Sequence, residues 1–158
     1  MSDLQCAATL LLARHGEAEH ESDRLPDARR GLTAAGREQA RALGRSLAGA
    51  RVAVVYTSPL SRAVQTAELV AAQTGAGVVV REGLEEQSVG GLLSELADLH
   101  RGETVVTVLD IGAIRTTVPA LTGLPDGFVS THPVPHASVV EVVVDGDGWV
   151  LRDWPGPG

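Results

Sequence analysis

The sequence predicts an α/β fold, with helices on both faces of a mainly parallel sheet, and three observations lead to that prediction. Short runs rich in valine and leucine alternate along the chain with longer amphipathic segments, which is the pattern of β-α-β units. Hydrophobic residues make up 44% of the sequence and aromatic residues 3%, so we expect a core of aliphatic side chains. The length of 158 residues suits one domain. We therefore expect a three-layer α/β/α sandwich, formed by a single domain over residues 1–158.

The first strand is predicted over residues 8–13, an apolar run that ends at Arg14 and His15. Gly16 follows, and it allows a sharp backbone turn that keeps side-chain bulk away from a ligand of His15. The polar, proline-containing segment 17–31 is predicted to be a solvated loop. The chain therefore places a guanidinium and an imidazole at the end of its first strand.

A helix, a strand and a second helix come next. Thr33 is a suitable N-cap for an amphipathic helix. Residues 52–56, rich in valine, predict the second strand. Ser58 or Ser61 can then cap a helix that carries Arg62 in its first turn.

The second half of the chain continues the alternation and ends in a pair of strands. The predicted elements are a strand over 78–80, a helix over 94–100, a strand over 104–109, a helix over 112–121, and two strands over 138–144 and 149–154. The sequence Asp145-Gly146-Asp147-Gly148 between the last two is typical of a hairpin turn. We therefore expect an antiparallel pair at the end of the chain.

Three polar residues follow predicted strands or begin the helices after them: His15, Arg62 and Asp110. Open α/β sheets bind their ligands at the carboxyl ends of the strands. We therefore expect these three side chains in one pocket, with no two of them more than about 15 Å apart, the reach of one small ligand.

The charge balance excludes two classes of partner. The formal net charge of −7 argues against nucleic acid and against an anionic membrane surface. All 13 basic residues are arginine, whose planar guanidinium suits oxyanions.

No apolar stretch approaches the ~20 residues of a membrane span, and no signal-peptide pattern is present, so we expect a cytoplasmic protein. Cys6 is the single cysteine, which excludes an internal disulfide. We expect no cofactor, and the sequence predicts no oligomeric state.

Four ordered blocks of residues carry a resemblance to a known family. They are Leu12-Ala13-Arg14-His15-Gly16-Glu17; Leu32-Thr33 with Gly36, Gln39-Ala40 and Leu43-Gly44; Tyr56-Thr57-Ser58-Pro59-Leu60-Ser61-Arg62-Ala63 with Gln65-Thr66-Ala67; and Leu84-Glu85-Glu86 with Gly90. In this order they resemble the histidine phosphatase superfamily, the phosphoglycerate mutase-like proteins. The match runs over nearly the whole chain, although the Trp-Glu-Gly that often follows the fourth block is missing.

The resemblance implies a set of site residues. His15 would attack a phosphoryl group and carry it as phosphohistidine, and Arg14 and Arg62 would clamp its oxygens. Ser58 lies in the block of the second arginine and is assigned to substrate binding. Glu86 would give a proton to the departing oxygen, the alternative being an exposed loop carboxylate.

The chain departs from the family pattern at Asp110. The resemblance places there the family's second histidine, which stabilises the phosphoryl transition state. Two unit charges about 4 Å apart interact by roughly 4 kcal/mol at an effective dielectric of about 20, so a carboxylate in place of a cation would slow phosphoryl transfer by about three decades. Ordinary phosphatase activity is therefore not expected unless burial keeps Asp110 protonated.

A second departure supplies a histidine on another side of the pocket. Where the family commonly has Asn-Ala-Ser, this chain has His136-Ala137-Ser138, with His132 four residues earlier. We assign His136 to substrate binding; the alternative is that both histidines are loop residues without a role. A metal site from His15, Asp110 and His136 is a further alternative, but the sequence spacing does not support it and we predict no metal.

Three functions stay open at this point. The first is a diverged phosphatase-like enzyme that acts on a small anionic metabolite through His15. The second is an enzyme on the same scaffold that uses Asp110 and His15 as an acid/base pair for an elimination, isomerisation or cyclisation. The third is a non-catalytic module that binds a phosphorylated ligand.

Overall fold

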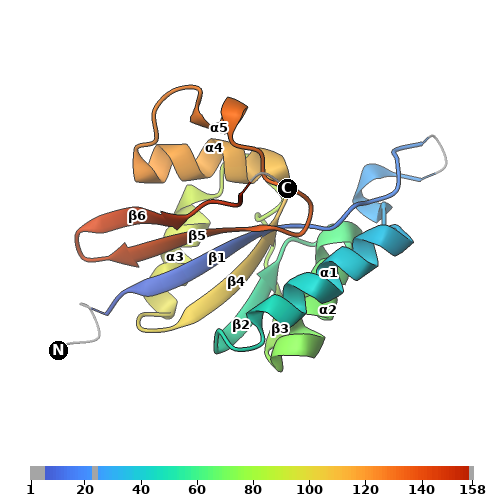
Figure 1. Ribbon diagram of the computed structural model, residues 1–158, viewed down its shortest axis with the longest axis horizontal. Coiled ribbons are helices and arrows are strands. Elements are labelled where there is room, and N and C mark those ends of the chain that lie inside the picture. The colour runs from blue at the N-terminus through green and yellow to red at the C-terminus, as the bar shows by residue number, and fades with distance from the viewer. Residues whose placement is uncertain (1–5, 23–24, 157–158) are drawn as a thin grey trace.

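The computed structural model of the protein describes residues 6–22 and 25–156, and its six strands form one sheet with the order β3-β2-β4-β1-β5-β6 (Figure 1). The strands are β1 (Ala8–Arg14), β2 (Val52–Thr57), β3 (Gly77–Val80), β4 (Thr104–Leu109), β5 (Val139–Asp145) and β6 (Gly148–Asp153). β1 pairs in parallel with β4, and β2 pairs in parallel with β4 and β3. β5 and β6 form the expected antiparallel hairpin beside β1. The mainly parallel sheet is therefore confirmed.

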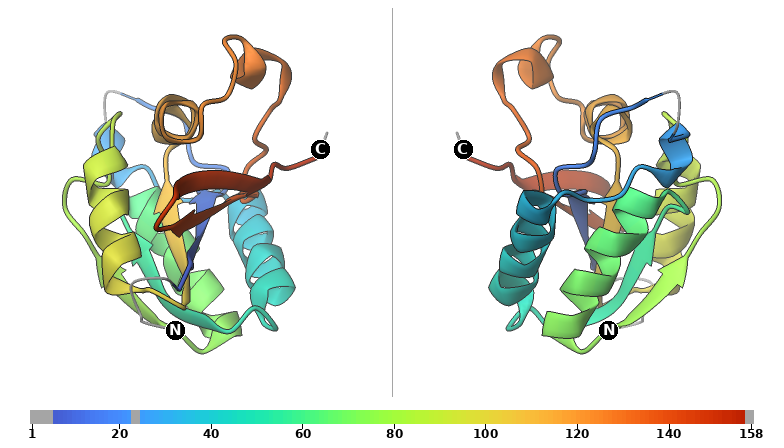
Figure 2. Two further views of the ribbon diagram at one scale, coloured as in Figure 1. Left: turned by 90° about the vertical axis from the view of Figure 1, so that its left-hand side faces the viewer. Right: turned by 90° about the vertical axis from the view of Figure 1, so that its right-hand side faces the viewer.

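Helices cover both faces of this sheet (Figure 2). They are α1 (Ala34–Leu47), α2 (Ser61–Thr74), α3 (Gly90–Leu99), α4 (Ile111–Thr122) and the short α5 (Phe128–Thr131), with a 3-10 turn, η2 (Asp27–Arg29), in the loop after β1. α1 and α2 lie on one face, and α3 and α4 lie on the other (Figure 2). Of the helices in the described residues, none is long and apolar enough to span a membrane. The three-layer α/β/α architecture is confirmed.

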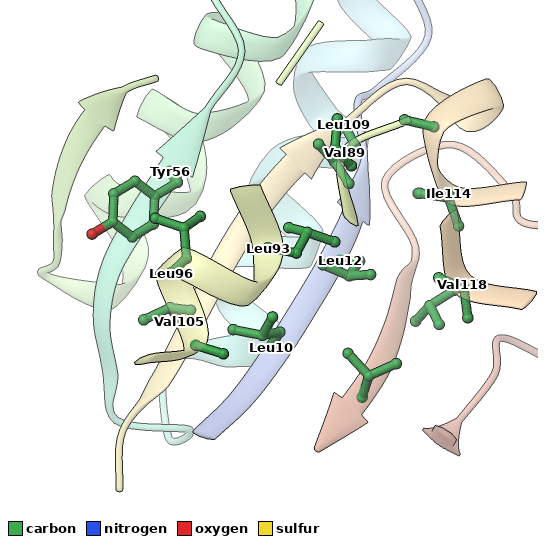
Figure 3. Packing of buried hydrophobic residues seen from close by; sticks show 14 of the residues in the cluster. Leu10, Leu12, Tyr56, Val89, Leu93, Leu96, Val105, Leu109, Ile114 and Val118 are labelled. Carbon is green, nitrogen blue, oxygen red and sulfur yellow. The ribbon is translucent and has the colours of Figure 1, made fainter. Parts of the chain in front are cut away.

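Two aliphatic clusters fill the space between the layers. Leu10 and Leu12 of β1 pack with Leu93 of α3 and Ile114 of α4 on one face (Figure 3). Leu11 and Ala13 of β1 point to the other face and belong to the cluster that α1 and α2 cover. Because successive side chains of a strand point to opposite faces, β1 contributes to both clusters and is buried on both sides.

Helix starts agree with the sequence at α1 and differ from it at two other helices. The Thr33 hydroxyl accepts a hydrogen bond from Gly36 N at 3.0 Å, so Thr33 is the N-cap as predicted. The expectation for α2 is wrong: its N-cap is Leu60, and the described residues provide no side-chain cap there. The α3 helix begins at Gly90, four residues earlier than expected, because it buries Leu93 completely and this burial outweighs the low helix propensity of the glycines.

Candidate active site

A cavity of about 700 Å³ opens at the carboxyl ends of β1 and β4. Its wall includes Arg14, His15, Glu17, Arg62, Gln87, Asp110 and His136, together with Ile111 and Gly112 at the start of α4. The sequence-based expectation that His15, Arg62 and Asp110 converge is met, since Asp110 contacts both of the others. A cavity of this size holds a small metabolite.

Close backbone packing fixes the position of His15. The segment after β1 lies against the first turn of α1, and a Cβ atom on Gly16 would lie 2.5 Å from the carbonyl oxygen of Gly36. A Cβ atom on Gly36 would lie 2.0 Å from the carbonyl oxygen of Glu17. Gly16 N also donates to Thr66 Oγ1 of α2 at 3.1 Å. Both positions therefore require glycine, and His15 is held between the sheet and two helices.

Both ring nitrogens of His15 face acceptors. Nδ1 lies 2.7 Å from the carbonyl oxygen of Gly16, and Nε2 lies 3.0 Å from Oδ1 of Asp110. A carbonyl oxygen accepts but cannot donate, and an ionised carboxylate is likewise an acceptor, so each contact calls for a proton on the nitrogen. Both ring nitrogens of His15 are therefore positioned to donate hydrogen bonds.

Asp110 is the anion at the centre of the site. Burial alone would raise its pKa, but hydrogen bonds from His15 and Arg62, with the charges of both, lower the pKa to about 2. Arg62 holds the carboxylate with two nitrogens, Nε at 3.2 Å from Oδ1 and NH2 at 3.0 Å from Oδ2. With its pKa lowered to about 2, Asp110 is ionised at neutral pH, which argues against the protonation by burial that the sequence left open.

Arg62 has little capacity left for a ligand. Its side chain is 5% exposed, and besides Asp110 it donates to the backbone oxygen of Asp27 at 3.0 Å and to Asp27 Oδ2 at 3.4 Å. Asp27 belongs to the loop that the sequence predicts to be solvated, and most described residues of this loop are exposed, with the Asp27 side chain 49% exposed. Its contacts with Arg62 supply hydrogen-bond acceptors to a deeply buried cation, which would otherwise carry a desolvation penalty.

Arg14 is the less neutralised of the two arginines. Its NH1 donates to the carbonyl oxygen of Val134 at 2.7 Å, and none of the ion pairs among residues 6–22 and 25–156 includes it. Burial lowers its pKa, the charge of Arg115 lowers it further, and Asp110 opposes the shift. A cation without an acidic partner in a cavity wall is suited to an anionic ligand.

Two residues assigned to the site from the sequence lie outside the cavity wall. Glu86 is exposed, and the turn in which its N–H donates to the carbonyl oxygen of Gly83 at 3.2 Å presents Gln87 to the cavity instead. Ser58 is 1% exposed and buried behind the wall, where its carbonyl oxygen accepts from the Thr57 hydroxyl at 2.9 Å. Neither Glu86 nor Ser58 is part of the cavity wall, and the roles that the resemblance implies for them stay predictions.

The two late histidines have different surroundings. His136 lines the cavity, with its ring centroid 6.2 Å from that of His15. His132 is exposed and stacks on Phe128 at 3.8 Å, apart from the residues that form the cavity wall. His136 is therefore in a position to contact a ligand of the cavity and His132 is not, while the assignment of His136 to substrate binding stays a prediction.

Several residues of the wall or its supports were not assigned to the site from the sequence, among them Glu17, His20, Asp27 and Gln87. Glu17 is the last residue of the block that contains His15, so its place in the cavity wall could have been predicted from the sequence. No sequence signal marks Gln87. In the described part of the chain, no group of three or more His, Cys, Asp or Glu side chains is placed to hold a metal ion, so the metal alternative gains no support.

Comparisons with known proteins agree with this geometry. The family model for the histidine phosphatase superfamily (branch 1) matches residues 10–92 and 89–155. Phosphoglycerate mutase from Bacillus anthracis superposes with a TM-score of 0.81 at 16% identity, covering 97% of this chain and 95% of that chain. Mycobacterial glucosyl-3-phosphoglycerate phosphatase, in complex with VO3, gives a TM-score of 0.78 at 20% identity and covers 94% and 99%.

The protein histidine phosphatase SixA, in complex with tungstate, gives a TM-score of 0.72 at 22% identity and covers 92% of this chain and 94% of that chain. No curated protein sequence matches the chain significantly. The family resemblance and the fold expected from it are confirmed.

Proposed function

The chain belongs to the histidine phosphatase superfamily, and we propose that it is an enzyme that acts on a small anionic metabolite by acid–base chemistry at His15 and Asp110, without a phosphohistidine. The observation that carries the proposal is the 3.0 Å contact between His15 Nε2 and Asp110 Oδ1. A nucleophilic imidazole needs a lone pair at this nitrogen. Here the nitrogen faces a carboxylate, an acceptor toward which it would direct a proton and not a lone pair.

The occupation of Arg62 supports the same conclusion. Two nitrogens of its guanidinium hold Asp110, in the bidentate geometry that carboxylates and phosphates share. Asp110 thus fills the place that a phosphoryl group would take on this arginine, and a dianionic phosphate would have to displace a charged, hydrogen-bonded side chain. Phosphate binding at Arg62 is therefore disfavoured.

An anionic group of the substrate still has a place at Arg14. This guanidinium lines the cavity, as do Ile111 and Gly112 at the N-terminus of α4, where unpaired backbone N–H groups and the helix dipole favour negative charge. The Asp110 side chain does not cap this helix within the described residues, so it leaves these N–H groups free. A carboxylate, sulfate or phosphate monoester group would bind against Arg14 and this helix end.

The proton between His15 and Asp110 is the one available for chemistry. The Asp110 side chain is 25% exposed, and a substrate oxygen bound beside it would accept this proton as negative charge develops on that oxygen. Eliminations, isomerisations and cyclisations all contain such a step. None of them requires a bond to phosphorus to break.

The proposal predicts poor turnover of a generic aryl phosphate. We expect the native protein to hydrolyse p-nitrophenyl phosphate at least about a thousandfold below the ordinary range of about 1–10³ s⁻¹. The variant Asp110→His should hydrolyse it at least about tenfold faster, because it replaces a repelling anion with a donor. The His15→Gln variant gives the background rate, and ordinary turnover by the native protein would contradict the proposal.

A second candidate, the diverged phosphatase, has one observation in its favour. The bond from His15 Nδ1 to the carbonyl oxygen of Gly16 leaves Nε2, the nitrogen that would attack phosphorus, directed toward Arg62 and Asp110. Mixing the protein with acetyl phosphate and mapping the product by mass spectrometry tests this function. A phosphoryl group on His15, absent from His15→Gln, would establish it in place of the first candidate.

A further inference from the structure

His136 is the second imidazole of the cavity wall, and the proposed acid–base step uses only the first. Its ring centroid is 6.2 Å from that of His15, with 46° between the ring planes. It also lines a neighbouring groove of about 480 Å³ between α1 and the start of β5. A ligand that extends from the main cavity into this groove therefore passes His136.

The backbone holds His136 firmly beside His15. Ala137 N donates to the carbonyl oxygen of His15 at 3.2 Å, and Arg14 N donates to the carbonyl oxygen of Ser138 at 3.0 Å. Ala137 itself has a φ of 55°, a left-handed conformation that is unfavourable for a residue other than glycine. Strain of this kind persists where the surrounding structure imposes it, and it is common at functional sites.

The Nδ1 edge of the His136 ring is closed to ligands. Nδ1 is buried, so Nε2 is the nitrogen that a ligand can reach.

The charges around His136 favour its neutral form. Burial lowers the pKa of His136, and the charge of Arg14 lowers it further. A hydrogen bond with the His15 backbone and the charge of Glu17 oppose this shift, while the charge of His15 adds to it. The two neighbouring imidazoles thus have opposite surroundings, because His15 faces a carboxylate and His136 faces a guanidinium.

We infer that His136 is the general base of the site, which removes a proton from the substrate through Nε2 while His15 serves as the acid. This inference rests on the proposed function. For such a base to act, the substrate would need an acidic C–H bond next to a carbonyl oxygen that accepts the His15 proton, with its anionic group bound at Arg14.

The step balances within the substrate. A C–H bond breaks, its proton goes to His136 Nε2, and the electron pair stays on the substrate as an enolate. The Nε2–H bond of His15 breaks as a new O–H bond forms on the enolate oxygen. One proton leaves and one enters, so the substrate is isomerised without a change in mass, and exchange with water resets both imidazoles.

Long-range 1H–15N NMR of the histidine rings tests the inference. The variants His136→Gln and His132→Gln assign the two late histidines, and His132 is the matched control outside the cavity. At pH 6.5 we expect a neutral His136 ring beside a doubly protonated His15 ring. In Arg14→Gln, the titration midpoint of His136 should rise, because the charge of Arg14 lowers its pKa. Sodium sulfate, as an oxyanion probe, should shift the ring resonances of His136 and leave those of His132 unchanged.

The outcomes separate this inference from the proposed function. A doubly protonated His136 at pH 6.5, or a sulfate response no larger than that of His132, would overturn the base role and leave the His15–Asp110 acid in place. A neutral His15 ring would overturn both. A neutral His136 that responds to sulfate, beside a doubly protonated His15, supports both.

Discussion

The helices α1 and α4 both begin at the cavity wall, each with a residue suited to capping at its N-cap position, and they use that residue differently. Thr33 turns its hydroxyl back to its own helix and accepts from Gly36 N at 3.0 Å. Asp110 makes no such bond within the described residues and directs its carboxylate to His15 and Arg62 instead. Thr33 therefore stabilises its own helix, whereas Asp110 forms the ion pairs of the site and does not cap α4.

The two N-termini also differ in how closely they follow the family pattern. The α1 side, with Gly16 and Gly36 in contact, agrees with the resemblance residue by residue. The α4 side carries Asp110 where the family has a histidine. A Cβ atom on Gly16 or Gly36 would lie less than 3 Å from a backbone oxygen, which leaves no room for another residue there. A side chain directed into a cavity can instead be exchanged when the chemistry changes. The divergence is therefore concentrated in the charges and not in the packing.

The largest expected effect comes from a substitution in the first turn of α1. Gly36→Ala would place a Cβ atom 2.0 Å from the carbonyl oxygen of Glu17, so we expect the free energy of unfolding to fall by about 3 kcal/mol, although alanine favours helix by about 1 kcal/mol. Urea denaturation measures it. Gly49→Ala is the matched control, since nothing lies within 4 Å of its Cβ. Equal stability of the two variants would refute the close-packing argument.

A smaller effect is expected at the N-terminus of α4, where Asp110 makes the stability depend on pH. The pKa of Asp110 is lowered from 3.8 to about 2 in the folded protein, so its ionised form stabilises the fold above pH 4 and this contribution is lost as the pH falls toward 2. The difference corresponds to about 2 kcal/mol. Between pH 5 and pH 2, the native protein should therefore lose about 2 kcal/mol more unfolding free energy than Asp110→Asn. Parallel pH profiles of the two proteins would show that the ion pairs do not form.

The smallest effect concerns the cap of α1. Thr33→Ala removes the acceptor for Gly36 N and should lower the free energy of unfolding by about 1 kcal/mol. Thr33→Ser, which keeps the hydroxyl, is the control and should retain most of the stability. Thermal unfolding of the three proteins checks this order, and a serine variant as unstable as the alanine variant would mean that the hydroxyl is not the stabilising group.

Local patterns in the sequence were sufficient for most of the fold. The apolar run before Arg14 and the Thr33 cap depend on neighbouring residues, and both were predicted correctly. The contact between Asp27 and Arg62 joins a loop to a helix 35 residues away, and no local pattern signals it. The choice between Glu86 and Gln87 could not be predicted from local sequence either. Gln87 reaches the cavity because its loop packs against Gly112 of α4, a contact between distant parts of the chain.

The protonation state of His15 tests the central claim most directly. With both nitrogens facing acceptors at 2.7 Å and 3.0 Å, we expect the long-range 1H–15N spectrum at pH 7 to show two protonated ring nitrogens, and Asp110→Asn to show one. A single protonated nitrogen in the native protein, with a lone pair at Nε2, would contradict the acid role of His15 and return the site to phosphoryl transfer.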